Sequence, residues 1–298
     1  AEGNVDAIIM RMPDRNSGAS LNCKDLYADY VKSNSFEKTM IRCLQSLIPY
    51  LERDDEIDIQ KIMNWEEVKE IIVPELVCTR RAGENLEDLI YRNVEGTDLA
   101  IIYRVKQQVA NIVGSIKVSK QMMETWGVDE NRIHEFAFHN MNQLSTLQIV
   151  ELNSDFAMPE ETFSELPEKM NKYSSYVFTN KEAFYGAATI MEEGMLHSIA
   201  ERLQEGFYLL PMDVDNIVVY PEGMMKNLES IHSMVLIHNI QCLEPENYLS
   251  DQVYYYSKEK GELSMSTNPE NTQDVIIKIL QQAMECSPGK EEDYGEER

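Results

Sequence analysis

The chain has 298 residues, of which 43% are apolar and 27% are charged. This composition excludes a disordered polymer, and no apolar run approaches the roughly 18 to 20 residues that a membrane-spanning helix needs. The formal net charge of −25 repels phosphate backbones and anionic lipid surfaces, so neither nucleic acid nor a membrane is an expected partner. An acidic excess of this kind also simply keeps a protein soluble.

The five cysteines are scattered, odd in number and without a Cys-x-x-Cys pair, which argues against a disulfide framework and a zinc knuckle. They are Cys23, Cys43, Cys78, Cys242 and Cys286. Residues 1–4 lack the charged start and apolar stretch of a signal peptide. We therefore expect a cytoplasmic protein.

The first part is predicted to be mostly helical after an opening strand at residues 5–10. Asn22 is a suitable N-cap for a helix over 24–31, and Ser35 for the next one, because short polar side chains satisfy free amides of the first turn. The apolar face of the second helix recurs at three- and four-residue spacing. It comprises Met40, Cys43, Leu44, Leu47 and Ile48.

Residues 71–78 are predicted to be extended, and Pro74 favours an edge position or a bulge because it has no amide to donate. Residues 98–105 are typical of a buried strand, which a run over 110–118 can pair with.

Ser119 is expected to cap a helix that Gly127 ends, since glycine readily takes the left-handed turn there. Asp129 then starts a helix to about Gln143.

A polar, proline-bearing stretch over 153–172 is the predicted boundary between two lobes. We expect an N-terminal α+β lobe at 1–152, a C-terminal lobe at 173–285 and a disordered acidic tail at 286–298.

The C-terminal lobe is predicted to repeat a β-β-α unit in tandem. The strands are expected at 175–179, 186–191, 207–210 and 216–220, and the helices at about 194–204 and 224–239. Apolar stripes on both helices, such as Met195, Leu196, Ile199 and Leu203, must be covered. We therefore expect one antiparallel-rich sheet with both helices on a single face.

A hairpin of residues 253–256 and 262–265 and a last helix over 272–284 complete the chain. The predicted fold class is α+β, with a helical N-terminal part, a small sheet and the tandem unit.

The sequence contains no complete motif of a catalytic, cofactor-binding or metal-binding site. The segment from His134 to His139 nearly spells the metalloprotease signature, but its histidines are five apart, about 140° around a helix, and cannot share one metal. His232 and His238 do not share a face either, and His197 stands alone. The sequence holds no nucleophile elbow, phosphate loop or dinucleotide fingerprint. No catalytic residue, cofactor or metal site is expected.

The 17 methionines and a run of three tyrosines point to binding instead. Thioethers repack around varied partners, and an outward aromatic on a strand can anchor an interface, although core filling is the simpler interpretation. The predicted interaction surface comprises Tyr254, Tyr256, Met224 and Met225.

Several blocks in fixed order, from about Val5 to Leu263, resemble a domain-of-unknown-function family of gut-dwelling, anaerobic Gram-positive bacteria. The blocks are residues 98–105, Trp126-Gly127-Val128, Asn140, 177–180 with 186–188, 207–211 and 249–256. The chain is more distantly similar to a second uncharacterised bacterial family. Neither resemblance implies an activity or a catalytic residue. Family members usually carry a further helix and strand before Val5, so the native start can lie upstream of Ala1.

Three hypotheses of function follow. The first is a non-catalytic module that binds another protein through the C-terminal repeat. The second is an enzyme whose site is assembled from sequence-distant polar residues, such as Asp98, Arg104, Asn140 and Asn180, and a deep polar pocket would favour it. The third is an acidic decoy that imitates nucleic acid, which needs carboxylates spaced like phosphates along one face.

Overall fold

The computed structural model describes residues 7–11, 18–51, 59–82, 86–109, 112–144, 146–152, 159–242, 247–273 and 275–278. The chain divides into two compact units. Unit 1 is residues 1–64 with 107–114, and unit 2 is residues 65–106 with 115–298.

Unit 1 is built from a hairpin and a pair of helices. Strands β1 (Ala7–Arg11) and β2 (Gly18–Asn22) pair antiparallel, and α1 (Cys23–Ser33) follows β2 directly. Helix α2 (Phe36–Leu51) comes next, then the short α3 (Ile59–Ile62). These elements confirm the predicted opening strand and helices.

Polar contacts join α1 to α2. The Ser35 Oγ accepts a hydrogen bond from the Lys38 amide at 3.4 Å, as the predicted cap requires. Arg42 of α2 donates to Asp29 of α1 at 3.3 Å, and the hydroxyls of Ser33 and Thr39 lie 2.8 Å apart. The two helices are thus tied together at the turn and along one side.

Unit 2 contains a small sheet that begins with a buried edge strand. Its strands are β3 (Ile72–Cys78), β4 (Tyr91–Asn93), β5 (Leu99–Val109) and β6 (Ile112–Lys117). Their order is β3-β5-β4, and β6 also pairs with β5. Pro74 lies on β3 at the edge of this sheet, where its missing amide costs no ladder bond, as predicted.

Three short helices and one of 15 residues flank the small sheet. They are α4 (Trp65–Val68), α5 (Thr79–Ala82), α6 (Lys120–Trp126) and α7 (Glu130–Leu144). Ser119 caps α6 by accepting from the Met122 amide, and Gly127 ends it at φ 66°. The Asp129 Oδ1 accepts from the Arg132 amide at 2.8 Å at the start of α7. The predicted caps are confirmed.

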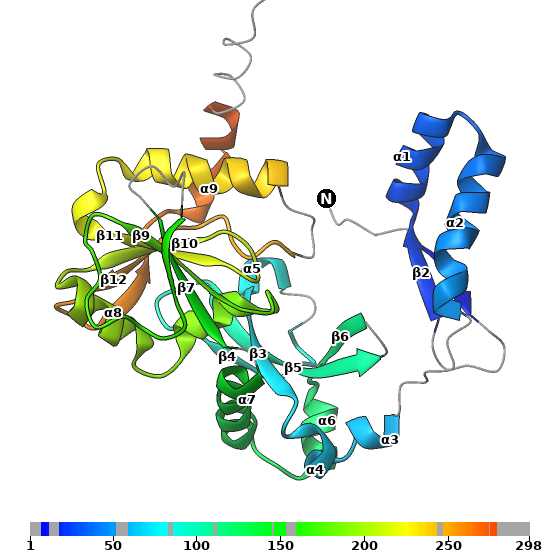
Figure 1. Ribbon diagram of the computed structural model, residues 1–298, viewed down its shortest axis with the longest axis horizontal. Coiled ribbons are helices and arrows are strands. Elements are labelled where there is room, and N and C mark those ends of the chain that lie inside the picture. The colour runs from blue at the N-terminus through cyan, green and yellow to red at the C-terminus, as the bar shows by residue number, and fades with distance from the viewer. Residues whose placement is uncertain are drawn as a thin grey trace, which may run out of the picture. The chain divides into compact units, whose positions relative to one another are not determined.

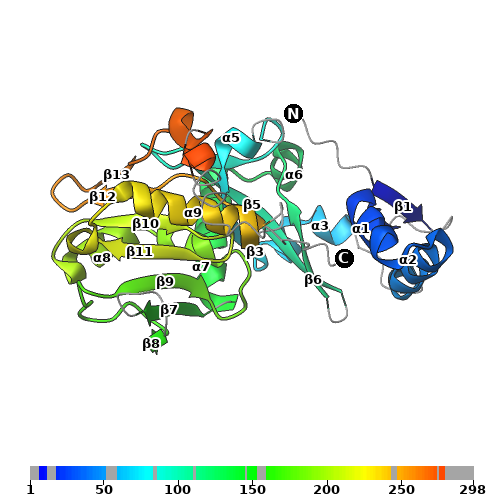
Figure 2. The ribbon, with the colours of Figure 1, turned by 90° about the horizontal axis from the view of Figure 1, so that it is seen from above.

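The large sheet of unit 2 has seven strands in the order β13-β12-β10-β11-β9-β7-β8. Each neighbouring pair is antiparallel. The strands are β7 (Leu147–Leu152), β8 (Pro159–Phe163), β9 (Ser175–Asn180), β10 (Phe207–Pro211), β11 (Ile217–Pro221), β12 (Tyr254–Ser257) and β13 (Glu262–Met265). The α+β class, the antiparallel-rich sheet and the β12–β13 hairpin are confirmed (Figures 1 and 2).

This sheet continues across the stretch predicted to separate two lobes. Strands β7 and β9 lie on either side of residues 153–172 and pair from Leu147↔Asn180 to Leu152↔Ser175. The division between the two compact units falls after residue 64 and at both ends of residues 107–114. The predicted tail at 286–298 lies outside the described residues.

The predicted strand at 186–191 is wrong. Residues Gly186–Met191 form a 3₁₀ helix, η1, whose Thr189 hydroxyl donates to the Gly186 carbonyl at 2.7 Å. The segment begins Gly-Ala-Ala, which has little of the β-branched surface that strands favour. A side chain at Gly186 would meet the Asp215 carbonyl oxygen at 2.5 Å, so the chain packs too closely there for another residue. The first copy of the predicted repeat, residues 175–204, is therefore not a β-β-α unit. The predicted tandem repeat is absent.

Two helices cover the large sheet, α8 (Met195–Leu203) and α9 (Leu228–Cys242). The 3₁₀ helix η2 (Glu222–Met224) precedes α9. Val235 of α9 packs in one cluster with Leu210 and Val218 of the strands. Figure 1 shows α8 on the opposite face of the sheet, so the two helices do not share one face as expected. Each helix packs its apolar side against a different face of the large sheet.

Gly96 offers a first test of this packing, because β13 lies directly against it. Its φ is 77°, and an added Cβ would lie 2.2 Å from the Leu263 carbonyl oxygen. We expect Gly96→Ala to lower the free energy of unfolding by about 1–3 kcal/mol, measured by urea denaturation. Gly127 is the matched control, since its φ is 66° but nothing lies within 4 Å of its Cβ position. A loss at Gly96 no larger than that of Gly127→Ala would contradict the close contact.

Candidate functional site

Strand β12 places its three tyrosines on alternating faces. Tyr254 is fully buried and Tyr256 is 5% exposed, so both lie in the core. Tyr255 faces the other way and donates to the Glu222 carboxylate at 2.8 Å. Burial, and then this hydrogen bond, raise the pKa of Tyr255 to about 12. Of the tyrosines in this run, the accessible one is therefore Tyr255, which was not among the predicted surface residues.

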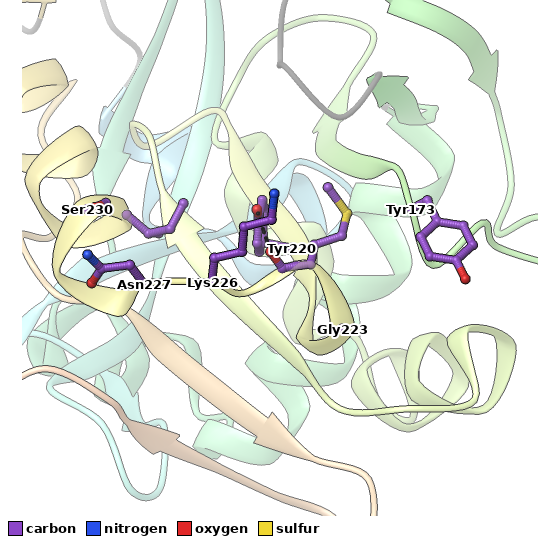
Figure 3. Close-up of a pocket in the computed structure, with 8 residues that line it drawn as sticks. Tyr173, Tyr220, Gly223, Lys226, Asn227 and Ser230 are labelled. Carbon is purple, nitrogen blue, oxygen red and sulfur yellow. Dashed lines mark hydrogen bonds between the residues drawn. The ribbon is translucent and has the colours of Figure 1, made fainter.

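Met224 and Met225, the other predicted surface residues, are half-buried at the end of η2. Met224 lines a pocket of about 430 Å³ with Tyr173, Tyr220, Gly223, Lys226, Asn227, Ser230 and Ile231. Figure 3 shows Tyr173 on one side of this pocket and Asn227 with Ser230 on the other. The Asn227 Oδ1 already accepts from the Glu229 amide at 3.0 Å, so it serves as the cap of α9. The lining can hold an apolar group, and Lys226 is the one lysine, arginine, aspartate or glutamate among its residues.

Helix α1 carries an apolar stripe that faces solvent. Tyr27 is 68% exposed, Tyr30 40% and Val31 60%. At 100° per residue these three positions fall within an arc of roughly 100°. The rings of Tyr27 and Tyr30 lie 6.5 Å apart between centroids. Helix α2 adds Phe36, Ile41 and Leu44, which are also exposed. We call these six residues the α1–α2 apolar surface.

A buried polar network links the two sheets of unit 2. Tyr254 of β12 donates its hydroxyl to the Asp98 Oδ1 at 2.7 Å, and Asp98 directly precedes β5. The Ser250 hydroxyl lies 2.7 Å from the same tyrosine oxygen. Burial, and then the charge of Asp98, raise the pKa of Tyr254, so its hydroxyl stays protonated as a donor.

The second oxygen of Asp98 faces two other groups. The Cys78 thiol donates to the Asp98 Oδ2 at 3.6 Å, and the Arg80 Nε lies 3.5 Å from the same oxygen. Asp98 therefore connects the end of β3 and the start of α5 to β12.

The structure does not gather the residues proposed as a dispersed active site. Arg104 pairs with the buried Glu75 carboxylate and donates to the Ser115 hydroxyl at 3.0 Å. Asn140 donates to the Lys69 and Ile72 carbonyls, which fixes α7 against β3. Asn180 accepts from the Phe184 amide and donates to the Phe184 carbonyl, closing a loop. Asp98 lines a pocket of about 620 Å³ in unit 2.

The histidines also serve packing roles. His134 is half-buried and lies 2.9 Å from the Tyr103 hydroxyl through its Nδ1. Burial, and then the charge of Arg92, lower the pKa of His134. His139 is exposed. His232 is 4% exposed, and its Nε2 donates to the Asp251 carbonyl at 2.9 Å. Burial lowers the pKa of His232, so it stays neutral in the folded state.

A family model covers nearly all of this architecture. The model described as Family of unknown function (DUF5688) matches residues 2–258. The chain belongs to this family. No curated protein and no solved structure matches it. The resemblance to a domain-of-unknown-function family is thereby confirmed, and the family brings no activity with it. The bacterial habitat and the similarity to a second family stay predictions.

The DUF5688 match includes the α1–α2 apolar surface and the whole Asp98 network, because Ser250 and Tyr254 precede residue 258. It ends before β13 and the segment around Thr272. Among the described residues, no helix is both long and apolar enough to cross a bilayer. Within the same part of the chain, no three His, Cys, Asp or Glu side chains gather as a metal site would require.

Sequence reasoning did not identify the exposed face of α1 or the hydrogen bond between Asp98 and Tyr254. The spacing of Tyr27, Tyr30 and Val31 is a signal of an apolar helix face, but the sequence does not say whether that face is covered. The Asp98–Tyr254 bond joins residues 156 apart, which no local pattern can reveal.

Proposed function

We propose that this protein is a non-catalytic module that binds another protein through the α1–α2 apolar surface. The observation that carries the proposal is the exposure of Tyr27 at 68% and Val31 at 60% on one face of α1. Contiguous exposed apolar side chains mark interaction sites more often than scattered ones do. Aromatic residues are also enriched at the centres of protein interfaces.

The tyrosines of this surface and the net charge of the chain indicate which kind of partner would fit. Tyrosine buries a large apolar area on binding and loses little side-chain freedom, because it has two χ angles. The net charge of −25 favours a partner with a basic rim around its apolar face, since complementary potentials speed association. A cytoplasmic location in a bacterium belongs to the same proposal, and the scattered cysteines support it.

The test is partner capture with charged variants of the stripe. We expect Tyr27→Lys and Val31→Lys to weaken binding by about tenfold or more, because each places an ammonium group in an apolar interface. Tagged protein would be expressed in cells that produce the chain naturally, and captured partners quantified by mass spectrometry. Gln121→Lys is the matched control, as it adds the same charge at an exposed position of α6, which is not part of the apolar surface.

The same variants separate binding from internal packing. Substitutions at exposed sites usually change the free energy of unfolding by less than about 0.5 kcal/mol. If Tyr27→Lys melts well below the parent, the stripe is covered by the chain's own residues, and the proposal fails. It also fails if the captured set is unchanged by both stripe variants.

A further inference from the structure

The pocket beside η2 joins an apolar wall to a lysine. Its volume of about 430 Å³ lies within the range of small-molecule sites, and all of its lining belongs to unit 2. Tyr220 is part of the same core cluster as Val235 of α9, and Met224 and Ile231 pack against that cluster. The wall is therefore anchored in the core. We call this cavity the Lys226 pocket.

Two tyrosine rings border the pocket. The Tyr220 hydroxyl donates to the Met224 carbonyl at 3.2 Å, so its one donor is already used and the ring itself forms the wall. Tyr173 is 66% exposed, and in the view of Figure 3 it lies across the pocket from Ser230, with Lys226 between them. Aromatic rings attract one another in tilted and offset arrangements, and thioethers adapt to their edges. A ligand with a ring would therefore suit this lining.

The Lys226 ammonium group is unpaired. Among the residues that the structure describes, it has no hydrogen bond and no ion pair, and its side chain is exposed. The pocket lining contains no aspartate or glutamate. An ammonium group offers three donors, and its hydrogen bonds to a carboxylate are stronger than those to a neutral acceptor. The charge at the pocket thus favours an anionic group, against the sign of the whole chain.

The carboxylates near this lysine are occupied by other groups. Two of them lie within four residues of Lys226 in the chain, and a third contacts the lining residue Gly223. They are Glu222 with the Tyr255 hydroxyl at 2.8 Å, Glu229 with the Lys278 ammonium at 3.0 Å and Glu205 with the Gly223 amide at 2.8 Å. Their bonds leave the Lys226 ammonium group available for a ligand.

We propose that the Lys226 pocket binds a small aromatic carboxylate. The carboxylate accepts hydrogen bonds from the Lys226 ammonium group, while the ring packs on Tyr220, Met224 and the ring of Tyr173. The volume of about 430 Å³ is sufficient for one ring with a short side chain. This site is independent of the α1–α2 apolar surface, which belongs to unit 1.

The experiment compares 3-phenylpropanoate with 3-phenylpropan-1-ol, two probes with the same ring and chain that differ in charge. Ligand-observed NMR on the full chain at about 0.15 M salt would measure both affinities, because distant charges are largely screened there. We expect the carboxylate to bind and the alcohol to bind about three- to tenfold more weakly. The net charge of −25 opposes any anion, so a preference for the carboxylate must arise locally.

Variants locate the binding. Lys226→Gln and Tyr173→Ala change exposed side chains, so both should fold, and each should weaken binding of the carboxylate by about threefold or more. Lys181→Gln is the matched control, since it removes the same charge at an exposed position outside the pocket lining and should leave binding unchanged. The proposal is overturned if 3-phenylpropanoate does not bind, if the alcohol binds as tightly, or if Lys226→Gln binds the carboxylate like the parent.

Discussion

Replacing Ile199 with aspartate should lower the free energy of unfolding by about 3 kcal/mol or more, because it would bury an unpaired charge. Ile199 is fully buried in the middle of α8, beside Ala200 and in line with Leu203. Chemical denaturation followed by circular dichroism would measure the loss. The matched control lies two residues earlier, at His197, which is exposed on the same helix.

His197→Asp adds the same side chain to the same helix at a solvated position, so its cost should stay within about 0.5 kcal/mol. Any effect of aspartate on helix propensity is similar in the two variants and cancels in the comparison. An Ile199→Asp variant as stable as His197→Asp would show that α8 does not pack through this face.

Sequence patterns located most elements because their signals are local. The α6 helix has its cap at Ser119 and its left-handed glycine at Gly127, and both act within one turn. The edge position of β3 follows from a single proline. The apolar stripe of α8 also predicts the burial of Ile199. Each of these inferences needed only the residues of the element itself.

The misjudged elements depend on contacts from elsewhere in the chain. The 3₁₀ helix η1 is fixed by tertiary contacts: the Tyr185 amide donates to the Asp215 carboxylate at 2.6 Å, with Tyr185 at a φ of 55°. An apolar stripe predicts that one side of α8 and one side of α9 are buried. Which face of the large sheet buries each helix depends on the arrangement of all seven strands. The same limit applies to α1, where a stripe typical of a core face is exposed.

The candidate sites were the least predictable part, for the same reason. Tyr254 was singled out as a surface aromatic, yet it donates its hydroxyl to a carboxylate 156 residues away. Asp98 was named among four dispersed polar residues, and the structure separates it from the other three.

The ion pair between Arg104 and Glu75 provides the second large effect. Their side chains are 17% and 6% exposed, and Arg104 also lies over the Tyr185 ring, 4.8 Å from its centroid. We expect Arg104→Met to lower the free energy of unfolding by about 3 kcal/mol, because it leaves the Glu75 carboxylate buried without its partner. Urea denaturation at neutral pH would measure the change.

A double variant tests whether that loss comes from the stranded carboxylate or from lost packing. Arg104→Met keeps most of the aliphatic stem of arginine, so the stacking on Tyr185 is only partly removed. If charge burial dominates, Glu75→Leu added to Arg104→Met should restore much of the stability, since a buried pair replaced by apolar residues is often neutral. The Ser115 hydroxyl remains satisfied in both variants, because it also lies 2.9 Å from the Tyr185 hydroxyl. A double variant less stable than Arg104→Met alone would show instead that Glu75 stabilises the fold without its arginine.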